Sequence, residues 1–195
     1  MKPRNRRKAN LGMAWEKTIA VEHLMYLRRG AAHIGKIPTP LKPVEPPHAR
    51  TPSERARFGG GSAVCMCRTE PTRHVDFEGV VLGGRSVRLE AKSSRAPRIP
   101  LDAVKPHQAK ALGHCDTLGG FAAVLVLIEA GMFLVPWIQW QAVPTSTGRI
   151  LKSLSGSDLE VVGLRFGTTE AAQAVLAGAS TRADWLTAAK KRGWI

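Results

Sequence analysis

The fold is decided by the stretch His74-Val75-Asp76-Phe77-Glu78-Gly79, a glycine turn, and Val87-Arg88-Leu89-Glu90-Ala91-Lys92. Both halves alternate in the manner of strands, so the stretch predicts a β-hairpin. Side chains alternate between the two faces of a strand, and Asp76 and Glu90 therefore share a face only if the hairpin loop has an odd length. A three-residue loop, Leu82-Gly83-Gly84, meets this condition and pairs Val81 with Arg85.

With this loop the hairpin has one apolar face and one charged face. The apolar face is predicted to contain Val75, Phe77, Val81, Val87, Leu89 and Ala91. The charged face is predicted to contain Asp76, Glu78, Arg88, Glu90 and Lys92. The apolar face would pack on the core and leave the charged face free for chemistry.

Two carboxylates beside a lysine are suited to phosphodiester hydrolysis. Carboxylate oxygens are hard ligands that bind Mg²⁺ while leaving positions for water and phosphate. The bound metal lowers the pKa of its water, and Lys92 would hold that water or stabilise the anion that forms. The alternative is that a solvated hairpin face carries charges of both signs, which is common in antiparallel sheets.

The composition favours a polyanionic partner. The chain contains 29 Lys and Arg against 15 Asp and Glu, a formal net charge of +14. Such an excess is typical of proteins that bind nucleic acid. Residues 1–9 are expected to form a basic arm that contacts phosphates, although the same residues also fit an organelle-targeting segment.

The remaining composition indicates one domain over residues 1–195. The longest apolar run, residues 121–128, is too short to span a bilayer, so we expect no membrane association and a cytoplasmic, nucleoid-associated protein. Three cysteines argue against a disulfide framework. Cys65 and Cys67, with His74 nearby, supply at most part of a zinc site.

Several elements are predicted outside the hairpin. A helix over residues 12–29 would place Met13, Glu16, Ala20, Leu24 and Leu27 on one buried stripe. Glu16 would then be either a third acidic group of the metal site or the partner of a buried Arg or Lys. Further helices are expected at 106–114, 169–177 and 182–192, and buried strands at 121–128 and 132–137.

The segment from about residue 41 to residue 73 is long, basic and rich in proline and glycine. Segments of this length inside a compact domain are either functional or disordered. The functional interpretation is a stalk-like insertion that contacts DNA, through Arg55, Arg57, Phe58, Arg68 and Arg73.

The order of several short motifs resembles the RecU family of Holliday junction resolvases. These motifs are Gly12-Met13-x-x-Glu16, Lys36-x-Pro38-Thr39-Pro40, Phe58, Asp76-Phe77-x-Gly79, Glu90-Ala91-Lys92, Pro100-Leu101, His107-Gln108 and Gly119-Gly120-Phe121. The resemblance implies a restriction-endonuclease-like α/β fold, with a mixed central sheet flanked by helices and a protruding stalk. It also implies a homodimer, Mg²⁺ with Mn²⁺ as a substitute, and branched DNA as the partner.

The resemblance also assigns roles to individual residues. Asp76 and Glu90 would be metal ligands, Lys92 the catalytic lysine, Glu16 an additional acidic member and Gln108 a residue close to the site. This chain departs from the family pattern at His74, where a threonine is usual, and at Leu11, where an arginine is usual. The stalk-like segment is also longer and contains two cysteines.

The sequence therefore predicts a metal-dependent endonuclease that resolves four-way junctions by paired, symmetric nicks in recombination and repair. One alternative is a nuclease of the same superfamily that acts on flaps, ends or ordinary duplex. The other is a non-catalytic nucleic-acid-binding protein, which would have no reason to place Glu90 and Lys92 on one face with Asp76.

Overall fold

The computed structural model describes residues 3–38, 41–44, 48–49, 51–53, 63–69, 74–142, 151–179 and 181–195. The chain divides into two compact units. The larger unit contains residues Met1–Ile37 and His74–Ile195, and the smaller unit contains Pro38–Arg73.

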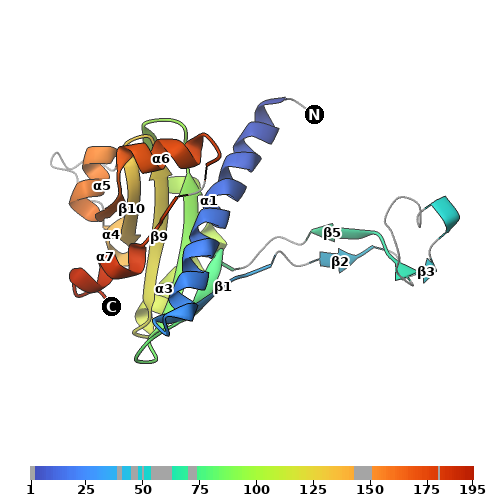
Figure 1. The fold of residues 1–195 in the computed structure, drawn as a ribbon, viewed down its shortest axis with the longest axis horizontal. Helices are drawn as coiled ribbons and strands as arrows, with labels where there is room; N and C mark the ends of the chain where they lie inside the picture. The colour runs from blue at the N-terminus through green and yellow to red at the C-terminus, as the bar shows by residue number, and fades with distance from the viewer. Residues whose placement is uncertain are drawn as a thin grey trace. The chain divides into compact units, whose positions relative to one another are not determined.

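The larger unit is built on a six-stranded sheet (Figure 1). The strand order is β1-β6-β7-β9-β10-β12, and β7 and β9 run parallel while the other neighbours are antiparallel. The strands are β1 (Ala32–Lys36), β6 (Phe77–Val81), β7 (Ser86–Ser93), β9 (Phe121–Ile128), β10 (Gly131–Pro136) and β12 (Leu164–Gly167). A short pair of strands, β8 (Arg98–Pro100) with β11 (Ser153–Ser155), forms a separate ladder.

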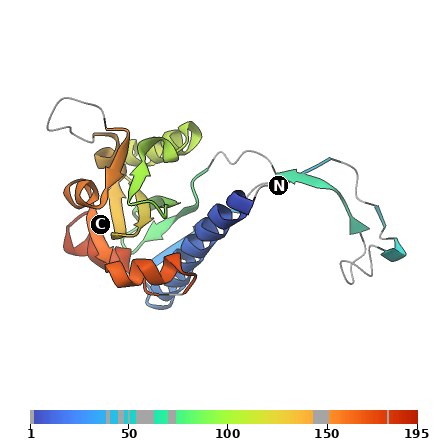
Figure 2. The ribbon, with the colours of Figure 1, turned by 90° about the horizontal axis from the view of Figure 1, so that it is seen from above.

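Helices cover both faces of this sheet, as Figure 2 shows for α1 on one side and α3 on the other. The first face carries α1 (Pro3–Arg28), α6 (Thr169–Leu176) and α7 (Trp185–Lys191). The second face carries α3 (Pro106–Thr117), α4 (Trp137–Gln141) and α5 (Gly156–Val162), and the short 3₁₀ helix η1 (Leu101–Ala103) precedes α3. The α/β class predicted from the sequence, a mixed central sheet flanked by helices, is confirmed.

Strand β9 separates the two cores, and both predicted strands around residues 129–131 are confirmed. Alternate residues Ala123, Leu125 and Leu127 belong to the first core, under α1, α6 and α7. The intervening residues Ala122, Val124, Val126 and Ile128 belong to the second core, under α3, α4 and α5. A strand that is buried on both faces has to be apolar throughout, which explains its unbroken hydrophobic run.

Helix α1 differs from the prediction in its start and in its buried face. It begins at Pro3 rather than near Gly12, so the predicted basic arm is helical from Pro3 onward. Leu11, Trp15, Ile19 and Tyr26 are buried, whereas Met13 is 66% exposed and Leu24 57% exposed.

The buried face of α1 was not recognisable from hydrophobicity because it also contains Thr18, Glu22 and His23. Two of these polar groups have tertiary partners, although the buried Nδ1 of His23 has none among the described residues. Glu22 pairs with Arg182 at 3.1 Å, and Trp185 Nε1 donates to His23 Nε2 at 3.0 Å. Both partners come from the C-terminal part of the chain, more than a hundred residues away.

The hairpin of β6 and β7 has the predicted register. Phe77 lies opposite Leu89 and Gly79 opposite Val87, and the Val81 amide donates to the Arg85 carbonyl at 3.0 Å. Gly83 and Gly84 in the loop have φ of 97° and 85°. These left-handed conformations favour glycine, which is why two glycines occupy the turn.

The two faces of the hairpin differ from the prediction in two respects. Val75 belongs to the second core rather than to the core that contains Phe77, because β6 begins only at Phe77 and the residues before it bend. The charged face is also not open along its length, since α3 packs on β7 and β9. Glu90 is consequently only 1% exposed.

The smaller unit contains two short antiparallel ladders. Strand β2 (Leu41–Pro43) pairs with β5 (Cys67–Thr69), and β3 (His48–Ala49) pairs with β4 (Ala63–Val64). The Sγ atoms of Cys65 and Cys67 lie 3.3 Å apart. No helix in the described part of the chain has both the length and the apolar character needed to cross a bilayer.

Candidate active site

Four of the predicted site residues meet around the centre of the sheet. Asp76 lies immediately before β6, and Glu90 and Lys92 lie on β7. Gln108 lies in the first turn of α3, where Pro106 begins the helix. Strand β7 is held on both sides by β6 and β9, so its side chains are mounted on a rigid part of the sheet.

Glu90, Lys92 and Gln108 form a closed set of contacts. Lys92 Nζ lies 2.6 Å from Glu90 Oε1, and Gln108 Nε2 donates to the same oxygen at 2.6 Å. Lys92 Nζ also donates to Gln108 Oε1 at 3.2 Å. Gln108 Oε1 further accepts the Lys105 backbone N–H at 2.9 Å, which fixes the amide at the start of α3. Gln108 therefore orients both charged groups.

Asp76 is positioned by the backbone of the same hairpin. Its Oδ2 accepts the Ala91 N–H at 2.9 Å, and its backbone carbonyl accepts the Ile37 N–H at 2.9 Å. Ala91 lies between Glu90 and Lys92 in sequence, so Asp76 is held beside the strand segment that carries both of them.

Burial and the negative charge of Asp76 raise the pKa of Glu90 to about 8, against the opposing effect of Lys92. Burial has the larger effect, because it removes the solvent that would stabilise the charged form. Glu90 Oε2 is buried and has no hydrogen-bond partner among the described residues. A buried carboxylate oxygen beside a second carboxylate needs a proton or a cation to balance it.

These two carboxylates fit a divalent cation. Asp76 and Glu90 would supply hard oxygen ligands, and Oε2 of Glu90, which has no hydrogen-bond partner among the described residues, would be one of them. The described residues contain no group of three or more His, Cys, Asp or Glu side chains arranged around one such position. A cation here would consequently complete its coordination with water and substrate oxygens, which is usual for Mg²⁺.

Glu16 is not brought into this set by any described contact. Its Oε2 pairs with Lys36 Nζ at 2.6 Å, and both side chains remain partly exposed. The structure thus shows an ion pair with a half-exposed lysine rather than with the buried Arg or Lys that the sequence left open, and the role of Glu16 as an additional acidic member stays a prediction. Lys36 lies opposite Phe77, the first residue of β6. The Glu16–Lys36 ion pair is therefore close to the start of β6, which Asp76 directly precedes.

Sequence reasoning quoted Lys36 within the motif Lys36-x-Pro38-Thr39-Pro40 but gave it no role in this region. The signal was present, because Lys36 is the last residue of β1 and precedes Ile37, whose amide holds Asp76. Without the register of β1 against β6, nothing in the sequence links Lys36 to the hairpin.

The predicted DNA-binding residues belong to the smaller unit. Arg68 lies on β5, opposite Lys42, and its side chain is exposed. Arg55, Arg57, Phe58 and Arg73 lie outside the described residues.

One comparison with known proteins, the match to a family model, agrees with the resemblance seen in the motifs. No curated protein matches the chain. A solved structure of Archaeoglobus fulgidus Hjc, a Holliday junction resolvase from an archaeal hyperthermophile, has a TM-score of 0.44 and 16% sequence identity. The match covers 83% of this chain and 99% of that chain. The model of the family described as RecU, Recombination protein U, matches residues 10–165. Because this match spans well over half of the sequence, the chain belongs to the RecU family.

Proposed function

We propose that this protein is a divalent-metal-dependent endonuclease that resolves four-way DNA junctions by paired, symmetric nicks. The observation that carries the proposal is the arrangement of Asp76, Glu90, Lys92 and Gln108. In it a buried oxygen of Glu90 lies next to a second carboxylate and has no hydrogen-bond partner among the described residues. Membership of a family of recombination proteins supports DNA as the substrate.

Each residue has a separate role in the proposed reaction. Asp76 and Glu90 would hold Mg²⁺, with Mn²⁺ as a substitute. When bound, the metal supplies an activated water and charge neutralisation at the phosphate. Lys92 orients the attacking water or stabilises the negative charge that develops on the phosphate oxygens. Gln108 keeps Lys92 and Glu90 in place through both of its amide atoms.

Charge and shape together support a branched substrate. The net charge of +14 gives a general attraction for phosphates. Phosphate contacts alone do not distinguish a junction from a duplex, so the preference has to come from shape. We assign this role to the smaller unit, through its basic residues Arg55, Arg57, Arg68 and Arg73 together with the aromatic Phe58.

The proposed active form is a homodimer, because two nicks related by a twofold axis need two sites related in the same way. The surface of α1 supports self-association. Met13, Val21, Leu24 and Leu27 are large apolar side chains at helical spacing, and all four are exposed in the single chain. An apolar stripe of this kind is typical of surfaces that become buried on association.

The test presents a four-way junction, a flap and a linear duplex in parallel, each with Mg²⁺ and with EDTA. We expect paired nicks in the junction, little cleavage of the other two substrates, and no cleavage in EDTA. Equal cleavage of all three DNAs would replace junction resolution by a less selective nuclease activity. Junction binding without cleavage of any DNA under any metal condition would leave only a binding protein.

A further inference from the structure

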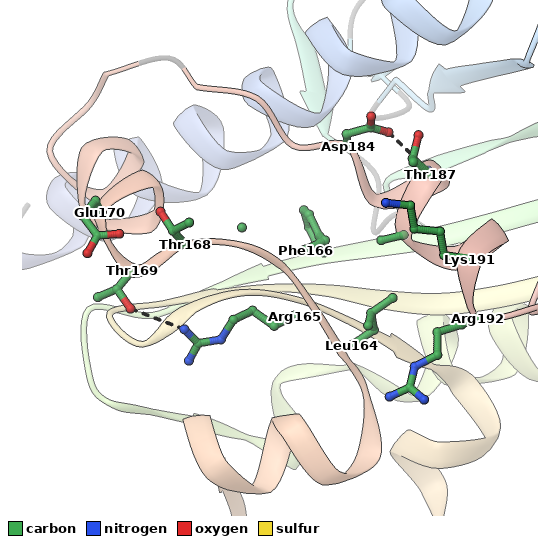
Figure 3. A pocket seen from close by; sticks show the side chains of 12 residues that line it. Leu164, Arg165, Phe166, Thr168, Thr169, Glu170, Asp184, Thr187, Lys191 and Arg192 are labelled. Carbon is green, nitrogen blue, oxygen red and sulfur yellow. Dashed lines mark hydrogen bonds between the residues drawn. The ribbon is translucent and has the colours of Figure 1, made fainter.

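A pocket of about 750 Å³ lies in the larger unit, away from the candidate active site. Strand β12 and the helices α6 and α7 line it, as Figure 3 shows. Helices α6 and α7 pack on the first face of the sheet, whereas Gln108 on α3 lies on the second. The pocket is therefore on the other side of the sheet from the proposed cleavage chemistry.

The pocket follows the free edge of the sheet. Strand β12 is last in the strand order and pairs only with β10 among the described strands. All four residues of β12 line the pocket. Because successive side chains of a strand point to opposite faces of the sheet, a pocket on one face alone would contact only alternate residues. The pocket thus runs along the strand itself. In an antiparallel ladder, alternate residues direct their N–H and C=O groups away from the existing partner.

Some charged side chains that line the pocket form ion pairs with described residues, and others do not. Arg165 pairs with Glu160 at 2.8 Å, and Asp184 pairs with Arg182 and caps α7. Hydrogen bonds at the start of α6 lower the pKa of Glu170. Lys191 and Arg192 also line the pocket, and neither forms an ion pair with a described carboxylate.

Apolar surface lies between these charges. Leu164, Phe166 and Ala188 contribute to the lining, and Phe166 stacks on Trp15 of α1 with ring centroids 6.4 Å apart. In Figure 3, Glu170 lies at the α6 end and Lys191 and Arg192 at the α7 end. An occupant would meet apolar side chains, backbone donors and acceptors of β12, and at one end Lys191 and Arg192, which form no ion pair with a described carboxylate.

From these features we infer that the groove between β12 and α7 binds an extended acidic peptide segment of a partner protein, which adds to the sheet as a further strand. A peptide backbone presents the alternating donors and acceptors that a strand edge needs. Nucleic acid has no such ladder, so the strand edge selects a peptide over DNA. Acidic side chains at one end of the segment meet Lys191 and Arg192, and apolar side chains cover Phe166.

The inference is tested with a fluorescent peptide of about eight residues in which aspartate alternates with leucine and valine. Binding is measured by anisotropy against the full chain, and the same peptide with lysine in place of aspartate serves as the charge control. We expect Lys191→Glu combined with Arg192→Glu to weaken binding by about tenfold or more. Lys190→Glu is the matched control, because it has the same charge on the same helix but does not line the pocket.

Hydrogen exchange identifies the mode of binding. Peptide addition should slow the exchange of β12 amides, because new backbone hydrogen bonds protect them. Junction nicking by the double variant should be unchanged, which also shows that it folds. The inference is overturned if β12 gains no protection, or if Lys190→Glu weakens binding as much as the double variant. It is equally overturned if a four-way junction displaces the peptide and the double variant loses junction affinity, since the groove would then be a DNA surface.

Discussion

At the scale of single residues, Asp76, Glu90 and Lys92 are expected to control cleavage without controlling junction binding. Asp76→Asn, Glu90→Gln and Lys92→Ala each remove one ionisable group from the candidate site while keeping the hairpin. We predict that nicking falls by about 10²-fold or more in each variant, the usual effect of losing a group that stabilises a transition state. Junction affinity measured by gel shift should change little.

Glu78→Gln is the matched control for these variants. Glu78 lies on the same hairpin, but it is exposed and only loosely paired with Arg88 at 3.7 Å. Its removal should leave nicking within about twofold of the unaltered protein, as is usual for a surface substitution. Near-normal nicking by any of the three site variants would reject the assignment of that residue.

The raised pKa of Glu90 also predicts a pH-dependent stability in EDTA. A carboxyl whose pKa is about 8 in the folded protein binds a proton that the unfolded chain, with its ordinary carboxyl pKa, has already lost. The free energy of unfolding should therefore decrease as pH rises from 6.5 to 8, by roughly 1–2 kcal/mol. The measurement is urea unfolding at several pH values.

Above pH 6.5, the pH dependence of the free energy of unfolding reports on Glu90 and not on His23. Burial lowers the pKa of His23 to about 3. Because the unfolded chain binds this proton more readily, His23 reduces the free energy of unfolding only as pH falls below its ordinary pKa of 6.5. In Glu90→Gln the free energy of unfolding should be nearly constant between pH 6.5 and 8. An equal slope in the variant and the unaltered protein would contradict the pKa assigned to Glu90.

The positions of these residues could be predicted only in part. Strand parity and the odd loop were enough to place Asp76 and Glu90 beside each other, because both follow from local geometry. The burial of Glu90 could not be predicted, since it arises from α3, which packs on the hairpin from elsewhere in the chain. The Glu16–Lys36 pair likewise depends on a strand register that the sequence does not reveal.

At the scale of elements, we expect that only glycine at position 79 allows the close approach of β1 and β6. A Cβ at this position would lie 2.0 Å from the His33 carbonyl oxygen and 2.6 Å from Ile34 Cα, both of which are backbone atoms. Because backbone cannot move aside without breaking the ladder, Gly79→Ala should lower the free energy of unfolding by about 3 kcal/mol or more. Urea or thermal unfolding measures this change.

Gly12→Ala provides the opposite case. Gly12 lies within α1, and an added Cβ would meet no atom within 4 Å. Alanine is favoured over glycine inside a helix, so this variant should gain about 0.5–1 kcal/mol. If both glycine variants were equally stable, the close approach of β1 and β6 would not limit the choice of residue at position 79.

The helices show where sequence patterns mislead. The strands at 121–128 and 132–137 were predictable because two-sided burial produces a continuous apolar run. The predicted buried face of α1 was wrong. The apolar Met13 and Leu24 were expected to be buried but are exposed, whereas the polar Glu22 and His23 are buried. Arg182 pairs with Glu22 and Trp185 donates to His23 Nε2, and such distant partners leave no local signal in the sequence.

At the scale of the whole molecule, the net charge predicts a strong salt dependence of junction binding. Each Lys or Arg that neutralises a phosphate releases a counterion, so affinity falls with the logarithm of salt concentration. With about six phosphate contacts, affinity should fall roughly 10³-fold between about 50 and 200 mM salt. Flat salt dependence in a titration by anisotropy would argue against a phosphate-tracking surface.

The smaller unit is expected to provide the preference for junctions. Replacing residues 41–73 by a short Gly/Ser connector should leave the candidate site intact but remove the difference in affinity between a four-way junction and a linear duplex. A variant with Gln in place of Arg55, Arg57 and Arg68 keeps the segment and should lose affinity for both DNAs alike. An unchanged preference in the shortened protein would place the discrimination on the larger unit.

The organisation of the chain was predictable in outline from composition. The proline and glycine content of residues 41–73 marked that segment as different from its surroundings. Its division into two short ladders was not predictable, because strands of two or three residues carry too little pattern.

The parallel pairing of β7 with β9 bears on when the candidate site is assembled during folding. Parallel strands need a long crossover, and here the crossover contains α3 and its Gln108. Asp76, Glu90 and Lys92 all leave the ribosome before β9, yet β7 gains its second neighbour only after Ile128 has been made. A growing chain thus carries the proposed site residues without their final support, and we expect the site to become competent only when the sheet is complete.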